Sequence, residues 1–386
     1  MTVYLDHAAT TPLRSEARDA WLAAIDTVGN PSSIHRSGQA ARRLLEDARE
    51  RLAAVLGCDA IEVVFTSGGT EAINLAVKGL WFSRAAERNV VVLPDGEHHA
   101  TLDAVEWLRT GEGATVRPVA LDRVARIPVD TFAKALAADV AVATAMVANN
   151  EAGTINDAVA LAAAATDAGV PLHLDAVASF GHCDLPFSSL ARSAAGGAHL
   201  MSISAHKIGG PPSIGALVVS RKATITALHH GGSAQRGLRA GTPDAPSAAA
   251  FAAAAEATFD ERVKEDFRLR ELRDALISGI GSVVPESELL GDPDDRLPGN
   301  AHFLFPGAAG ESMLYLLDAA DIAVSTGSAC QAGIAEPSHV VQAMGRTEAE
   351  ARSVLRMTVG RTTTPADVDA VIAAVGDAYR RASGRR

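Results

Sequence analysis

The chain has 386 residues, 48% of them hydrophobic and 21% charged, and its formal net charge at pH 7 is −11. This composition excludes a disordered or fibrous protein, and the length favours two domains that share one site. Basic residues gather only at 380–386, so we expect no direct binding to nucleic acid, which requires clustered Lys and Arg.

Short apolar segments rich in β-branched residues alternate with longer Ala- and Leu-rich segments. The apolar segments predict buried strands at 61–65, 90–93, 140–146, 172–174, 200–203 and 216–219. The periodic segments predict helices at 40–56, 70–81, 100–109, 130–137 and 157–167, the first of them ending at Gly57. This alternation predicts an α/β fold with a mostly parallel central sheet flanked by helices, whose site lies at the carboxyl ends of the strands.

A second, smaller α+β domain is expected after the change in composition near 247–257. The sequence predicts a charged helix at 261–280, strands at 301–305, 322–324 and 354–359, and a final helix from Pro365. We therefore assign 15–255 to a large domain. Residues 1–14 and 256–386 form the small domain, which carries the segment around Cys330.

A glycine-containing turn, TSGGTE at 66–71, connects the first predicted strand to a helix. Backbone N–H groups at a helix N-terminus near Gly69, with the hydroxyl of Thr70, can hold an anion. The segment lacks the spacing of a nucleotide P-loop and of a dinucleotide-binding fold. Taken alone, it favours an ordinary glycine-rich turn.

Asp175 stands at the end of one predicted strand, and Lys207 follows the next one. A lysine amine forms Schiff bases with carbonyl groups, and a carboxylate can keep a pyridine nitrogen protonated. Without further context, a buried ion pair explains these two residues equally well.

The three cysteines are widely scattered and form neither a disulfide framework nor a CxxC zinc pattern, so no metal site is expected. Cys330 lies in STGSACQAG at 325–333, where small neighbours leave a thiol accessible as a nucleophile. Cys58 and Cys183 adjoin regular structure and are expected to be packing residues. The first residues lack the features of a signal peptide, and no segment has the ~20 apolar residues of a membrane span, so a cytoplasmic setting is expected.

Eight short motifs follow one another along the chain. They are YLDHAATTP at 4–12, GNPSS at 29–33, TSGGTE at 66–71, EH at 97–98, NNE at 149–151, SAHK at 204–207, RAGT at 239–242 and SAC at 328–330. Their order resembles that of the cysteine desulfurases, which are class V, fold type I relatives of the aminotransferases and use pyridoxal 5'-phosphate. The resemblance extends from residue 4 to about residue 374.

The resemblance implies a role for each matching residue. Lys207 is expected to form the Schiff base with the cofactor, Asp175 to bind its pyridine nitrogen and His98 to stack on its ring as a catalytic residue. The phosphate ligands implied are Gly69, Thr70, Ser204 and His206, together with Thr242, which would reach across a homodimer interface. Asn150 is expected near the cofactor and, with Arg356, at the carboxylate of the substrate.

The implied reaction converts L-cysteine to L-alanine. Lys207 would move the α-proton, and the Cys330 thiolate would take the sulfur as a persulfide for transfer to a protein acceptor. The alternative is a selenocysteine lyase or another C–S lyase on the same scaffold, for which Cys330 would be dispensable. A non-enzymatic protein with this fold is disfavoured, because Lys207, Asp175, His98 and Cys330 are all present.

Two segments depart from the family pattern. Ala178 stands where the family usually has a glutamine that touches the phenolic oxygen of the cofactor. The second departure is at 233–236, where Ala234 and Gln235 stand in place of the His or Gln followed by Glu that is common in the family. Ala178 therefore either removes a hydrogen bond to that phenolic oxygen or is a packing residue without effect on the cofactor.

Overall fold

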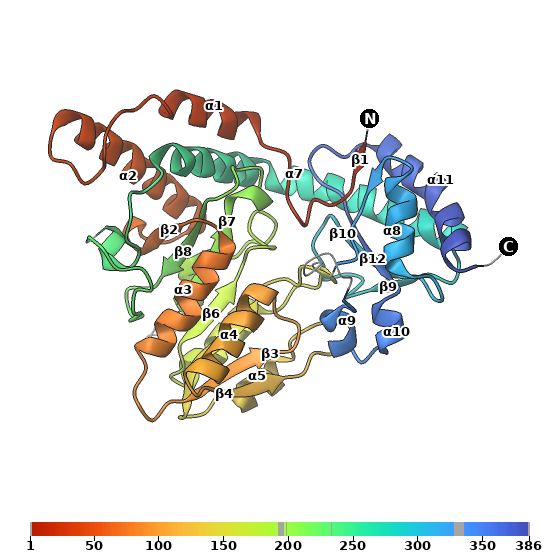
Figure 1. Ribbon diagram of the computed structural model, residues 1–386, viewed down its shortest axis with the longest axis horizontal. Coiled ribbons are helices and arrows are strands. Elements are labelled where there is room, and N and C mark those ends of the chain that lie inside the picture. Colours follow the sequence, from red (N-terminus) through yellow and green to blue (C-terminus); the bar gives the residue numbers. More distant parts are fainter. Residues whose placement is uncertain (1, 192–196, 198, 233, 328–335, 385–386) are drawn as a thin grey trace.

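A seven-stranded sheet forms the centre of the larger part of the molecule in this computed structural model, which describes residues 2–191, 197, 199–232, 234–327 and 336–384 (Figure 1). Its strands are β2 (Val63–Thr66), β3 (Val90–Pro94), β4 (Thr115–Val119), β5 (Val140–Met146), β6 (Leu172–Asp175), β7 (His199–Ser204) and β8 (Gly215–Val219). Their order is β2-β8-β7-β6-β5-β3-β4, and only β8 is antiparallel to its neighbours. The mixed α/β fold with a largely parallel sheet is confirmed.

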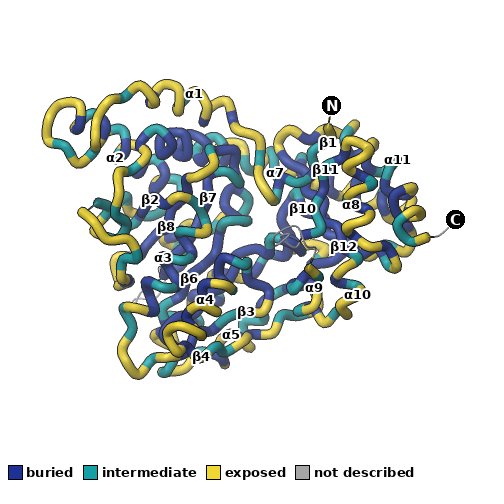
Figure 2. Tube along the Cα trace, in the orientation of Figure 1, coloured by how far each residue is buried: buried dark blue, intermediate teal, exposed yellow. Residues whose placement is uncertain are grey.

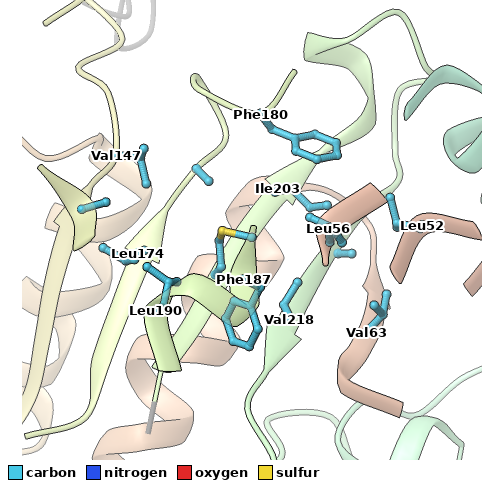
Figure 3. Close-up of a cluster of buried hydrophobic side chains, with 14 of the residues drawn as sticks. Leu52, Leu56, Val63, Val147, Leu174, Phe180, Phe187, Leu190, Ile203 and Val218 are labelled. Carbon is cyan, nitrogen blue, oxygen red and sulfur yellow. The ribbon is translucent and has the colours of Figure 1, made fainter. Parts of the chain in front are cut away.

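Helices cover both faces of this sheet because its strands are apolar on both sides. α3 (Gly69–Phe82) and α4 (His99–Gly111) pack on one face. The other face is covered by α2 (Arg36–Leu56), α5 (Val129–Ala135), α6 (Ala158–Asp167) and the first part of α7 (Ala245–Val283). Figure 3 shows part of the hydrophobic core on this second face. There Leu52 and Leu56 of α2 lie over side chains of β2, β6, β7 and β8.

Two smaller sheets lie beyond the central one, on the right in Figure 1. One has the order β12-β10-β9 and the other pairs β1 with β11. These strands are β1 (Val3–Tyr4), β9 (Glu288–Leu290), β10 (Asn300–Leu304), β11 (Ile322–Ala323) and β12 (Val354–Thr358). Around them lie α8 (Gly310–Asp318), α9 (His339–Ala343), α10 (Glu348–Ala351) and α11 (Pro365–Ala382). A separate hydrophobic core lies between these strands, α8, α11 and the end of α7, and α9 and α10 pack in a smaller cluster.

α7 corrects one expectation, because it is a single helix where the sequence predicted a new helix from residue 261. Its Ala-rich first part is buried against the large sheet, and Leu269, Leu272, Leu276 and Ile280 of its charged part pack on the second core. The change in composition therefore marks a change in what the helix packs against. The predicted boundary after residue 255 lies within α7, and the domain limits stay a prediction.

Three further differences have local causes. The strand predicted from 61 begins at Val63, because Asp59 and Glu62 form a capping box around the short turn η1 (Ala60–Glu62). The edge strand β4 was not predicted, since it contains Arg117 and Pro118. α1 (Ser15–Ala24) was also missed, because much of its surface is exposed (Figure 2).

Among the described residues, no helix is both long enough and apolar enough to cross a membrane.

Candidate active site

A cavity lies at the carboxyl ends of β5, β6 and β7, where the central sheet faces the smaller sheets. Every predicted site residue in the described part of the chain lines it, except Thr242. These lining residues are Gly69, Thr70, His98, Asn150, Asp175, Ser204, His206, Lys207 and Arg356. Thr242 is exposed outside this cavity, and Cys330 lies outside the described residues.

Asp175, the last residue of β6, is 2% exposed. Burial raises the pKa of its carboxyl group to about 6, although hydrogen bonds from the Val177 N–H and the Ser202 hydroxyl and the charge of Lys207 act in the opposite direction. Both hydrogen bonds fall on Oδ1, at 2.9 Å and 3.4 Å. The other oxygen is therefore available to a protonated ring nitrogen in the cavity.

Lys207 ends the short turn η3 (Ala205–Lys207) directly after β7. Its ammonium group donates to the carbonyl of Ala8 and, at 3.0 Å, to that of Ala9. Burial and the nearby charge of Arg356 lower its pKa to about 8, with Asp6 and Asp175 opposing the shift. The lowered pKa increases the share of free amine near neutral pH, which suits both Schiff-base formation and proton transfer.

His98 is the N-cap residue of α4, and its Nδ1 accepts a hydrogen bond from the Ala100 N–H at 3.1 Å. Burial, and then the charge of Lys207, lower its pKa to about 4. The ring is therefore neutral near pH 7. Because Nδ1 is an acceptor, the proton is on Nε2, which can donate.

The start of α3 forms an anion-binding cradle. Gly68, its N-cap, supplies no side-chain hydrogen bond, so the first N–H groups of the helix lack that partner. A Cβ on Gly69 would lie 2.7 Å from Val177 Cγ2, so only glycine leaves this space open. The nearby hydroxyl of Ser204 is buried and has no hydrogen-bond partner among the described residues. An unpaired hydroxyl beside a helix N-terminus fits a phosphate group.

Arg356 lies on β12 and lines the wall of the cavity that the smaller sheets form. Its guanidinium donates to the Asn150 carbonyl and to Asp6 Oδ1, both at 2.9 Å. Its Nε is buried without a partner in the described part of the protein. A partly unsatisfied arginine at the edge of a cavity is suited to a carboxylate.

Glu151 lies close to two described residues, Gly327 and Ser338, which precede and follow Cys330 in the sequence. Its Oε2 accepts from the Ser338 hydroxyl at 2.5 Å, and a Cβ on Gly327 would lie 3.1 Å from the same oxygen. His339 follows Ser338, lines the cavity and bonds to the Glu97 carbonyl through Nε2 at 2.9 Å. Sequence reasoning missed Glu151 and His339 as individual residues, although the NNE motif contains the first.

The two departures from the family pattern have different surroundings. Ala178 lines the site cavity and also a second cavity on the other side of Lys207, which contains the His182–Asp266 pair. The amide of Gln235 is away from both and pairs with the backbone N–H and C=O of Phe65, at 2.7 Å and 2.8 Å. Gln235 thus completes the hydrogen bonding of the edge strand β2, which is a structural role.

Residues 3–371 match the family described as Aminotransferase class-V. The chain therefore belongs to the class V aminotransferase family. An IscS-like cysteine desulfurase of Mycobacterium tuberculosis (strain ATCC 25618 / H37Rv) is 46% identical to it, over 98% of this chain and 96% of that protein.

Two solved structures agree with this assignment. A NifS-like protein has a TM-score of 0.89 at 28% identity, over 98% of this chain and 99% of its own. SspA in complex with cysteine has a TM-score of 0.80 at 28% identity, with coverages of 93% and 99%. Within its family the chain therefore belongs to the cysteine desulfurases, and the protein is an enzyme.

Proposed function

We propose that the protein uses pyridoxal 5'-phosphate to convert L-cysteine to L-alanine and collects the sulfur as a persulfide on Cys330. The observation that carries this proposal is the meeting of a lysine with a lowered pKa, a buried carboxyl group and an unpaired hydroxyl at a helix N-terminus in one cavity. A solved relative, SspA, is described in complex with cysteine, which supports the substrate.

The chemistry of the cavity fits this cofactor at both of its ends. Gly69, Thr70, Ser204 and His206 would hold the phosphate, and Asp175 would hold the pyridine nitrogen. When bound through Lys207, the cofactor supplies an electron-withdrawing ring that weakens bonds to the α- and β-carbons of the amino acid.

Other side chains would bind the substrate and move its protons. Arg356 and Asn150 would orient the substrate carboxylate, and Lys207, once released as a free amine, would take the α-proton. His98 has a neutral ring with a proton on Nε2, so it would act as a hydrogen-bond donor toward the cofactor or the substrate.

In the sulfur-transfer step the Cys330 thiolate attacks the substrate sulfur, forming an S–S bond as the substrate C–S bond breaks. The electron pair of that bond remains with the carbon, which takes up a proton and becomes the methyl group of alanine. Sulfur is oxidised and carbon is reduced by equal amounts, so no further oxidant is needed. The persulfide would then pass to a protein acceptor.

The other two cysteines are poorly suited to this step. Burial raises the pKa of the Cys58 thiol to about 12 and that of Cys183 to about 11. Both are therefore protonated at neutral pH, and a thiol is a much weaker nucleophile than a thiolate.

A homodimer is part of the proposal. Thr242 is exposed, and Pro243 of its loop shares a surface hollow with Pro31 and Ser32. Apolar side chains near that hollow are unusually exposed, at 82% for Val28 and 91% for Ile34. A second subunit would cover this surface and could receive Thr242 at its phosphate site. The need for free thiols also favours a reducing, cytoplasmic setting.

The direct test is a product assay with L-cysteine, followed by peptide mass spectrometry. The wild-type protein should form alanine and carry one extra sulfur on Cys330. Cys330→Ser should still bind cofactor and cysteine but form no persulfide, whereas Cys58→Ser should behave as wild type. Release of free sulfide at an undiminished rate by Cys330→Ser would instead indicate a C–S lyase, and extra sulfur on Cys58 or Cys183 would contradict the assignment.

The dimer is tested separately by sedimentation over a range of protein concentrations. We expect a dimer, and we expect Thr242→Ala to lower the affinity for pyridoxal 5'-phosphate. A monomer with undiminished cofactor affinity would disprove this part of the proposal.

A further inference from the structure

Three polar side chains form a hydrogen-bonded line beneath Asp175, inside the central sheet. The Thr144 hydroxyl of β5 lies 3.0 Å from His173 Nδ1 of β6, and His173 Nε2 lies 3.0 Å from the Ser202 hydroxyl of β7. Ser202 then reaches Asp175 Oδ1 at 3.4 Å. Thr144, His173 and Ser202 are all fully buried, so water does not compete for these bonds.

The strand register brings these residues together. Thr144 is the partner of His173 in the β5–β6 ladder, and Ser202 is the partner of Asp175 in the β6–β7 ladder. His173 and Asp175 are two residues apart on one strand, so their side chains point to the same face. The line therefore follows from the pairing of three adjacent parallel strands.

The donor and acceptor of each hydrogen bond follow from the carboxylate of Asp175, at which the line ends. An ionised carboxylate can only accept, so Ser202 must donate its single proton to Asp175. Ser202 then has only acceptor capacity for His173, which requires the proton on Nε2. Burial lowers the pKa of His173 to about 3, so its ring is neutral and Nδ1 must accept from Thr144.

We propose that Thr144, His173 and Ser202 are positioning residues, a line of donors that all point toward Asp175 and keep its carboxylate ionised beneath the cofactor ring. This proposal rests on the proposed function, because its purpose is to leave the proton on the pyridine nitrogen. Without the donors, the proton would move from the ring to the carboxylate, and the ring would withdraw electrons less strongly.

Other charges around Asp175 must be held constant in any test. The charge of Asp175 opposes ionisation of Glu97, and Lys207 favours ionisation of Asp175. His98 and His206 also line the cavity, and both have pKa values of about 4, so they stay neutral from pH 5 upward. The variants below leave all four of these residues unchanged.

The first experiment uses cofactor-free protein containing ¹³C-labelled aspartate, with the Asp175 signal assigned by its absence in Asp175→Asn. Ser202→Ala should raise the pKa of Asp175 by about one unit, since it removes a hydrogen bond to a charged group. Thr144→Val should raise it by a smaller amount, and Thr144→Ser, which keeps the hydroxyl, should restore the wild-type value.

Thr166→Val is the matched control. Thr166 makes the same kind of bond, 2.9 Å to Nε2 of the buried His199, but this pair has no hydrogen bond leading to Asp175 among the described residues. It should leave the pKa of Asp175 unchanged. An unchanged pKa in both Ser202→Ala and Thr144→Val would overturn the proposal, as would an equal shift in Thr166→Val.

The second experiment measures the ring-nitrogen chemical shift of ¹⁵N-labelled pyridoxal 5'-phosphate bound to the same variants. The nitrogen should lose its proton at a lower pH in Ser202→Ala and Thr144→Val than in wild type and Thr144→Ser. Identical titration curves would overturn the proposal. Failure of the wild-type protein to take up the cofactor would refute the proposed function instead, and the first experiment would still decide whether the donor line acts on Asp175.

Discussion

The turn after β3 and the end of β6 each hold a buried carboxyl group, and the two differ in their hydrogen bonds and in the charges beside them. Glu97 is fully buried, and its Oε1 accepts from the Met146 N–H at 2.7 Å. Its Oε2 has no partner among the described residues. Asp175 receives two hydrogen bonds on one oxygen and keeps the other for the cavity.

The pKa values of the two carboxyl groups also differ. Burial, and then the charge of Asp175, raise the pKa of Glu97 to about 8, whereas that of Asp175 is raised only to about 6. Near pH 7 Glu97 is therefore mainly protonated and Asp175 mainly ionised. Two neighbouring buried carboxyl groups cannot both ionise at low cost, and the hydrogen bonds to Asp175 together with the charge of Lys207 favour ionisation of Asp175.

The largest expected effect contrasts the two positions directly. Asp175→Asn removes the charge that would stabilise the protonated ring, so we expect kcat/KM to fall by about 10²- to 10³-fold. Glu97→Gln replaces a neutral acid with a neutral amide that can still accept from Met146, so kcat/KM should change by less than about threefold. Steady-state alanine formation measures both. A loss in Glu97→Gln as large as that in Asp175→Asn would show that Glu97 is the ionised group.

The pH dependence of stability in cofactor-free protein tests the protonation of Glu97. Between the unfolded pKa, near 4.5, and the folded pKa of about 8, the folded state holds a proton that the unfolded state has lost. Stability from this group is thus present at low pH and declines as pH rises through that window. The decline is limited to about 1.4 kcal/mol per pH unit.

Glu97→Gln should remove the contribution of Glu97 to this decline between pH 6.5 and 8, and because the histidines and Lys207 titrate alike in both proteins, the difference between the two stability curves isolates Glu97. Denaturant unfolding at several pH values gives the comparison. Parallel stability curves for the variant and the wild type would contradict a protonated Glu97.

The smallest expected effect concerns Ala178, beside Asp175. A glutamine there would fill part of the opening between the two cavities and could donate to the phenolic oxygen of the cofactor. Ala178→Gln should therefore shift the pH at which the visible absorbance of the bound cofactor changes, to a higher value by about one unit or less. Overlapping titration curves would show that Ala178 is neutral packing.

The sequence predicted those parts of the fold that depend on local pattern. The apolar run of β5 was placed at its observed bounds, since a fully buried strand has an unmistakable composition. β4 was missed because an edge strand tolerates Arg117 and Pro118, and the continuity of α7 was missed because its surroundings change along its length. The cavity-lining residues were also predicted from the sequence, because each of them lies in a short motif that can be recognised locally.

Partnerships between distant segments could not be predicted. The Thr144–His173–Ser202 line depends on strand register, and the bond from His339 to Glu97 joins positions 242 residues apart. One clue was present: two polar residues, His173 and Asp175, alternate on an otherwise apolar strand, which places both on one face.

The most direct test of the account is reduction of the purified protein with borohydride after incubation with pyridoxal 5'-phosphate, followed by peptide mapping. We expect a single stable adduct, on Lys207, and loss of the visible absorbance of the cofactor in Lys207→Ala. An adduct on another lysine, or one that persists in Lys207→Ala, would contradict the assignment of this cavity as the cofactor site.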